Sequence, residues 1–122
     1  MILGITKDEQ FGPLILMGFG GIYTEVFNQV ILLMPPFDCQ VVRNALRELP
    51  HYNILHGVRG ESAVDIESYC KAAVGLSDLA LAFGDCIDEM DINPVKVMAK
   101  GCIGLDALLI RSQKQILERE CS

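Results

Sequence analysis

The chain has 122 residues, the length of one typical domain, and 51% of them are hydrophobic against 21% charged. This composition excludes an intrinsically disordered protein and predicts one domain, residues 1–122, with a buried core and a polar tail over 112–122. Ten basic and sixteen acidic side chains give a net charge of −6, so we expect binding neither to nucleic acid nor to a membrane surface.

The sequence also indicates the compartment. Met1–Thr6 lacks the basic leading segment of a signal peptide, and the apolar run from Val30 is stopped by Pro35-Pro36, far short of a membrane span. An odd number of cysteines without C-x-x-C spacing supports neither a disulfide framework nor a zinc site (Cys39, Cys70, Cys86, Cys102 and Cys121). We therefore expect a cytoplasmic protein with reduced thiols.

The first third of the chain predicts four strands. Gly4–Lys7 and Leu14–Phe19 flank the turn Phe11-Gly12-Pro13, and the β-branched and aromatic run Ile22–Phe27 precedes a further strand over Gln29–Met34. Alternation within the third strand places the carboxylate of residue 25 between two aromatic side chains of the same face. Such a carboxylate needs a partner or water.

Two helices follow. Asp38 is a suitable N-cap for a helix that ends at Pro50, and a loop is expected from there to Gly60. A capping box that begins at Ser62 predicts the start of a long helix, whose apolar stripe runs to a stop at Gly84. With two further strands at the C-terminal end, the order of elements favours an α+β fold, in which two helices pack against a largely antiparallel sheet.

The two last strands, Met90–Met98 and Cys102–Ile110, form a predicted hairpin that carries one amide, Asn93, and one carboxylate, Asp106, among apolar residues. If 100–101 is the loop, the two side chains are diagonal neighbours on one face, and if 99–100 is the loop they are directly opposite. Either register brings two oxygen ligands together, as Mg²⁺ requires at nucleotide sites, whereas a three-residue loop without a bulge would place them on opposite faces. The alternative is that Asn93 caps a turn and Asp106 pairs with a basic side chain.

A glycine pair, Gly20-Gly21, follows the second predicted strand. The next residues are strand-like, which excludes a Rossmann or P-loop reading because those loops open a helix. Adjacent glycines still allow backbone N–H groups to approach an anion closely, and the alternative is a plain tight turn.

Five motifs in this order resemble the C-terminal half of the ATP-grasp domain in ADP-forming acyl-CoA (acetyl-CoA) synthetases. They are Phe11-Gly12-Pro13-Leu14-Ile15, Gly18-x-Gly20-Gly21-Ile22-Tyr23-x-Glu25-Val26, His56-Gly57-Val58-Arg59-Gly60, Asp91-Ile92-Asn93-Pro94-Val95 and Leu105-Asp106-Ala107. Related segments occur in the succinyl-CoA synthetase β subunit and in fused protein lysine acetyltransferases. The resemblance covers residues 4–111 and implies the C-terminal subdomain of an ATP-grasp fold.

The resemblance also implies a site for Mg²⁺ and ATP or ADP. Its metal ligands match Asn93 and Asp106, and its phosphate site is bordered by residues that match Gly20, Gly21 and Glu25, with Arg59 as an anion contact. Glu25 and Arg59 would then be the catalytic residues, in a reaction that needs mainly positioning and charge neutralisation. One departure is Leu108, where the family commonly has a basic residue.

The implied activity is that of an ADP-forming acid–CoA ligase, which exchanges acyl-CoA, ADP and phosphate with the free acid, CoA and ATP through a phosphohistidine. This chain would be a fragment without activity of its own. Its partners would be the other ATP-grasp half and the CoA-binding and phosphohistidine domains, in the same protein or another subunit, within an oligomer. The alternatives are the ATP-grasp scaffold of a protein lysine acetyltransferase and a non-catalytic interaction module.

Overall fold

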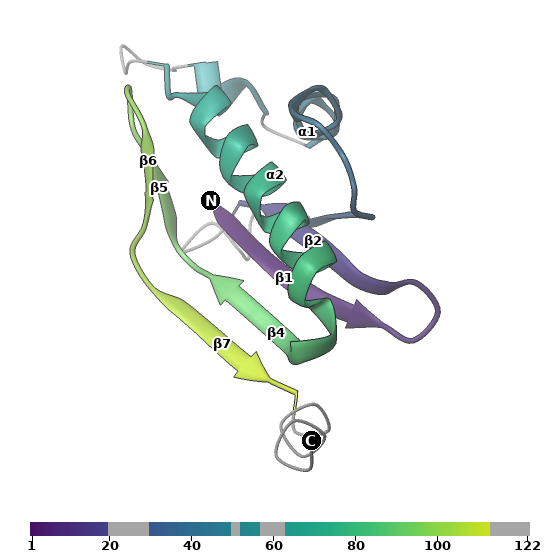
Figure 1. The fold of residues 1–122 in the computed structure, drawn as a ribbon. Helices are drawn as coiled ribbons and strands as arrows, with labels where there is room; N and C mark the ends of the chain where they lie inside the picture. Colours follow the sequence, from purple (N-terminus) through teal and green to yellow (C-terminus); the bar gives the residue numbers. More distant parts are fainter. Residues whose placement is uncertain (20–29, 50–51, 57–62, 113–122) are drawn as a thin grey trace.

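A computed structural model describes residues 1–19, 30–49, 52–56 and 63–112. Within them, a five-stranded antiparallel sheet has the order β3-β2-β1-β4-β7, and a separate two-stranded sheet pairs β5 with β6 (Figure 1). The strands are β1 (Ile2–Asp8), β2 (Gly12–Gly18), β3 (Val30–Leu33), β4 (Ile87–Ile92), β5 (Val95–Val97), β6 (Cys102–Gly104) and β7 (Ala107–Arg111). The helices are α1 (Cys39–Arg47) and α2 (Ile66–Phe83), with 3₁₀ turns η2 (Tyr52–His56) and η3 (Gly84–Cys86). The α+β prediction is confirmed.

The predicted β1–β2 hairpin is present, and both strands are longer than the sequence pattern indicated. Seven residue pairs join them, from Ile2 opposite Gly18 to Asp8 opposite Gly12. The side chain of Asp8 closes the turn by accepting hydrogen bonds from the backbone N–H groups of Gln10 and Phe11 at 2.8 and 3.0 Å. Gly12 follows with a φ of 74°, a conformation that favours glycine.

The N-cap of α1 is Asp38, as predicted, and it accepts a hydrogen bond from the N–H of Val41 at 3.0 Å. The predicted start of α2 is wrong. The helix begins at Ile66 with Asp65 as its N-cap, three residues after the Ser62 cap that the sequence motif favoured. The reason is that the Asp65 carboxylate finds partners both in the helix and in a distant turn, which outweighs a local capping box.

The core lies between α2 and one face of the sheet. On β1 and β2 this covered face consists of Leu3, Ile5, Ile15 and Met17, all at most 2% exposed. Tyr69 of α2 is fully buried, and its hydroxyl donates to the carbonyl oxygen of Ile2 at 2.6 Å. α1 packs against α2 and adds Val42 and Leu46 to the same core.

None of the four described cysteines forms a disulfide bond: Cys39, Cys70, Cys86 and Cys102. Burial raises the pKa of Cys70 to about 11, so at neutral pH this thiol stays protonated in the core. In the part of the chain that the structure describes, no helix is long and apolar enough to cross a membrane.

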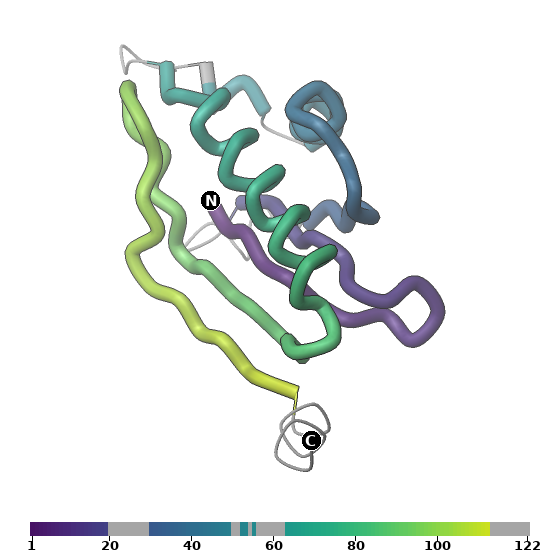
Figure 2. The backbone as a smooth tube through the Cα atoms, viewed as in Figure 1, coloured from purple at the N-terminus to yellow at the C-terminus, as the bar shows by residue number. Residues whose placement is uncertain are grey.

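The C-terminal hairpin is present, but each of its predicted strands is divided in two. β4 ends at Ile92 and β5 begins at Val95, while β6 ends at Gly104 and β7 begins at Ala107. Figure 2 shows that the segment β4–β5 nevertheless runs beside the segment β6–β7 over its whole length, up to the turn between β5 and β6. The interruption falls on Asn93-Pro94, because proline has no N–H to donate to a strand ladder.

Candidate functional site

The face of the sheet that points away from α2 forms one surface across all five strands. The registers align Leu32 (β3), Leu16 (β2), Gly4 (β1), Asp91 (β4) and Leu108 (β7) in a single row. Leu32 and Leu108 are 51% and 56% exposed, in contrast to the covered face. We call this surface the open face.

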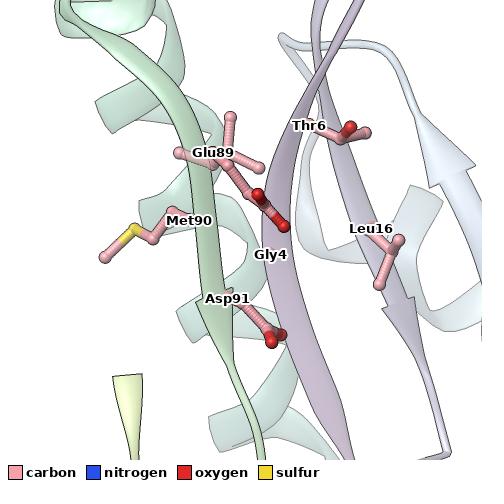
Figure 3. A pocket seen from close by; sticks show the side chains of 7 residues that line it. Gly4, Thr6, Leu16, Glu89, Met90 and Asp91 are labelled. Carbon is pink, nitrogen blue, oxygen red and sulfur yellow. The ribbon is translucent and has the colours of Figure 1, made fainter. Parts of the chain in front are cut away.

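Two carboxylates of β4 stand on the open face. Glu89 and Asp91 line a shallow pocket of about 100 Å³ together with Gly4, Thr6 and Leu16, and Figure 3 shows both carboxylates beside β1. The pocket floor requires a glycine, since a Cβ on Gly4 would lie 2.6 Å from the carbonyl oxygen of Met90. Because Gly4 has no side chain, β1 and β4 can approach closely, and the space above Gly4 stays open between the two carboxylates and β1.

Asn93 and Asp106 continue this arrangement towards the hairpin. The backbone N–H of Asn93 donates to the carbonyl oxygen of Asp106 at 3.1 Å, and the same register holds on either side, with Ile92 opposite Ala107 and Val95 opposite Gly104. The two residues are thus directly opposite each other. This is the register that results when 99–100 is the loop, and alternation along β4 places the pair on the side of Asp91.

The environment of the pair differs from the one that the sequence pattern suggested. Asn93, Asp106 and every residue of β7 are exposed. The apolar residues that surround the pair in the sequence therefore do not bury it. β7 is the edge of the sheet, and no described helix covers its apolar side chains, which explains the difference.

The expected alternative for Asp106, an ion pair, is not observed in the described part of the chain. Its Oδ1 accepts the N–H of Ala107 at 2.9 Å, whereas the ion pairs within residues 1–19, 30–49, 52–56 and 63–112 join Lys7 to Asp88 and Arg43 to Glu67. The remaining carboxylate oxygen of Asp106 therefore has no basic partner among these residues.

The donors suit a hard divalent cation. Among the described residues, no three Asp, Glu, His or Cys side chains lie close enough to hold an ion, which excludes a closed site of the zinc type there. Mg²⁺ instead takes one or two carboxylates and completes its shell with water and phosphate oxygens. One exposed carboxylate opposite one exposed amide fits this pattern.

Four of the site residues expected from the resemblance lie outside the described residues: Gly20, Gly21, Glu25 and Arg59. Sequence reasoning missed Gly4, Glu89 and Asp91. The period-two spacing of residues 89, 91 and 93 would have indicated that two further carboxylates share a face with Asn93. Leu108, the departure from the family pattern, lies on the open face as well.

Comparisons with known proteins identify the family. A family model described as "ATP-grasp domain" matches residues 1–110. An acetate–CoA ligase [ADP-forming] I of Archaeoglobus fulgidus is 35% identical over 114 residues, which are 93% of this chain and 16% of that protein. The β subunit of acetate–CoA ligase [ADP-forming] I from Pyrococcus furiosus is 36% identical over 90% of this chain and 47% of the subunit.

A solved structure shows the same fold. The acetyl-coenzyme A synthetase 1 of Ca. Korarchaeum cryptofilum, in complex with coenzyme A and Mg-AMPPCP, superimposes with a TM-score of 0.84 at 34% identity, covering 91% of this chain and 52% of that one. The chain thus spans about half the length of the Pyrococcus furiosus β subunit and of the Ca. Korarchaeum cryptofilum chain. With a family match over nearly its whole length and a shared fold, this chain belongs to the ATP-grasp domain family.

Proposed function

We propose that this chain is the Mg²⁺- and phosphate-binding part of an ADP-forming acid–CoA ligase. The observation that carries the proposal is the pairing of Asn93 with Asp106 on the open face, both exposed and with no basic partner for Asp106 in the described residues. The similarity to ADP-forming acetate–CoA ligases supports the reaction class.

Asn93 and Asp106 would hold the cation, the former by its amide oxygen and the latter by its carboxylate. When bound, Mg²⁺ would neutralise negative charge on the phosphate oxygens of ATP or ADP. Gly20 and Gly21 would present backbone N–H groups to the phosphates. Glu25 and Arg59 would orient and neutralise the transferring group, since phosphoryl transfer depends mainly on positioning and electrostatic stabilisation.

The reaction would convert acyl-CoA, ADP and phosphate into the free acid, CoA and ATP through a phosphohistidine carried by another domain. This chain would supply one wall of the cleft. A single wall can neither exclude water nor orient both reactants, so we expect the 122-residue chain alone to have no synthetase activity.

The exposed apolar side chains at and beside β7 support an interface with another domain. Leu105, Leu108, Leu109 and Ile110 are 42–59% exposed along one edge of the sheet, and grouped exposed apolar side chains are typical of interaction surfaces. We propose that the other ATP-grasp half, together with the CoA-binding and phosphohistidine domains, covers this edge in an oligomer. The absence of a disulfide among the described cysteines is typical of a reducing compartment, which supports the cytoplasm as the location.

One observation favours a second candidate. Leu108 stands on the open face where related sequences commonly have a basic residue, so one charge for neutralising phosphate is absent from that position. A nucleotide-binding scaffold, such as the ATP-grasp portion of a protein lysine acetyltransferase, would tolerate this loss better than a ligase would.

Activity of the complete enzyme tests the proposal. Asp106→Asn removes the charged ligand and should lower turnover by at least about 100-fold, while the protein stays folded because Asp106 is exposed. Asp78→Asn, which removes an exposed carboxylate of α2, is the matched control and should leave turnover unchanged. Full activity of Asp106→Asn would refute the ligase assignment of this face, and acyl-CoA-dependent ATP formation by the chain alone would refute the fragment.

A further inference from the structure

Asp65 contacts two distant parts of the chain at once. Its Oδ1 accepts the backbone N–H of Ser68 at 3.1 Å, the usual bond of an N-cap residue. Its Oδ2 accepts the Ser68 hydroxyl at 2.7 Å and also the backbone N–H of Gly101, in the β5–β6 turn, at 2.8 Å. In addition, the backbone N–H of Asp65 donates to the carbonyl oxygen of Met98 at 2.7 Å.

These contacts replace part of the turn's own hydrogen bonding. A two-residue hairpin loop is normally closed by two bonds between the residues that flank it. Here Met98 N–H donates to Gly101 O at 2.9 Å, but the Gly101 N–H and the Met98 carbonyl, which would form the second bond, are both bonded to Asp65. Asp65 thus completes the closure of a turn that lies more than thirty residues away.

The hairpin needs such an anchor. β5 and β6 are three residues each and pair only with one another, and an isolated two-stranded hairpin is marginal in water. The other end is held where Val95 exchanges two backbone hydrogen bonds with Met1, at 2.6 and 2.9 Å. The register of the hairpin is therefore held at both ends, and a slip of one residue at the turn would move a side chain to the opposite face.

The turn is in continuous register with the metal-ligand pair. From Met98 opposite Gly101, the pairing runs through β5 and β6 to Leu105 N–H, which donates to Pro94 O at 2.9 Å, and on to Asn93 opposite Asp106. The distance along the strand is roughly 16 Å. What is fixed at the turn is therefore also fixed at the pair.

We propose that Asp65 is a positioning residue for the divalent-cation site. By clamping the β5–β6 turn to the N-terminus of α2, it helps to hold the register that places Asn93 opposite Asp106. This inference rests on the proposed function of that pair. The hydrogen bond from Gly101, followed by those from Ser68, lowers the pKa of the Asp65 carboxyl, so the group is charged at neutral pH.

The substitution Asp65→Ser separates the two roles of Asp65, capping of α2 and bonding to the β5–β6 turn. Asp65→Ser keeps a good N-cap for α2. Its single oxygen atom cannot take the positions of both Oδ1, which accepts the Ser68 N–H, and Oδ2, which accepts the Gly101 N–H. The matched control is Asp38→Ser, because Asp38 caps α1 in the same way without a described contact to the hairpin. Asp65→Asn is a second, milder variant, since it keeps one acceptor oxygen and the shape of the side chain.

Amide hydrogen exchange in the 122-residue chain gives a readout independent of activity. Asp65→Ser should accelerate exchange of the Asn93 and Leu105 N–H groups about tenfold or more relative to a core amide of β1, and Asp65→Asn should do so to a smaller extent. Asp38→Ser should leave the ratio unchanged. Equal ratios in the wild type and both Asp65 variants would overturn the clamp.

Binding of Mn²⁺ with ADP to the complete enzyme tests the link to the cation site. Loss of a partner that orients metal ligands typically weakens metal binding 10- to 100-fold, so Asp65→Ser should weaken Mn²⁺ binding at least tenfold and Asp38→Ser should not. If Asp106→Asn weakens binding and Asp65→Ser does not, the positioning role fails and the proposed function stands. If Asp106→Asn has no effect on Mn²⁺, both fail together.

Discussion

The two faces of the five-stranded sheet are built from the same strands but serve opposite purposes. On the covered face, Ile15 and Met17 of β2 are fully buried beneath α2, whereas on the open face Leu32 and Leu108 are more than half exposed, and Leu108 lies opposite Asp91. Alternation along each strand separates the two sets. Under the proposed function, removing a large side chain from the covered face should therefore lower stability, whereas removing an exposed side chain from the open face should mainly alter binding.

The largest difference between the faces concerns stability. Ile15→Ala on the covered face should lower the free energy of unfolding by about 2–5 kcal/mol, because a fully buried side chain leaves a cavity. Leu32→Ala on the open face should cost less than about 1 kcal/mol, since half of that side chain is already in water. Urea unfolding of both variants measures the contrast. Similar losses would mean that another part of this chain covers the open face.

Two glycines sharpen the comparison, because replacing each by alanine should change the free energy of unfolding in opposite directions. Gly4→Ala should destabilise the fold by about 1–3 kcal/mol, since the new Cβ would lie 2.6 Å from a backbone oxygen of β4 and the two strands would have to separate. Gly75→Ala, on the exposed side of α2 with open space around it, should instead stabilise the fold by about 0.5–1 kcal/mol. Thermal unfolding of the two variants distinguishes them, and a stabilising Gly4→Ala would contradict the tight β1–β4 approach.

The smallest expected effect is a pH dependence at Asp65, the N-cap of α2. The pKa of Asp65 is lowered in the folded protein by its hydrogen bonds from Gly101 and Ser68, so its contribution to stability is present above the ordinary aspartate value of about 4. It is lost as the pH falls through the lower, folded-state pKa. The stability difference between the wild type and Asp65→Asn should therefore shrink below pH ~4. A difference that stays constant from pH 7 to pH 3 would exclude a charged clamp.

How far the sequence predicted these features depends on how local each signal is. The Asp38 cap, the stop before Gly84 and the antiparallel hairpins follow from neighbouring residues, and all were predictable. The start of α2 was not, because Asp65 is selected by a contact with Gly101 across 36 residues. The exposure of Asp106 was hidden for a similar reason, since an apolar strand at a sheet edge has the same pattern as one in the centre.

The residues of the candidate site were likewise predictable only in part. Sequence spacing left two registers open for Asn93 and Asp106, and the geometry of the turn at 99–100 selects one of them. The resemblance supplied roles for Gly20, Gly21, Glu25 and Arg59, which remain predictions because they lie outside the described residues.

Paramagnetic broadening by Mn²⁺ with ADP, measured on methyl groups of the complete enzyme, tests the central claim most directly. If the open face holds the cation, the methyl signals of Leu108, two residues from Asp106, should broaden much more strongly than those of Ile5 and Ile15 on the covered face. The broadening of Leu108 should disappear in Asp106→Asn and persist in Asp78→Asn. Equal broadening on both faces, or broadening of Leu108 that survives Asp106→Asn, would contradict the assignment of this face as the cation site.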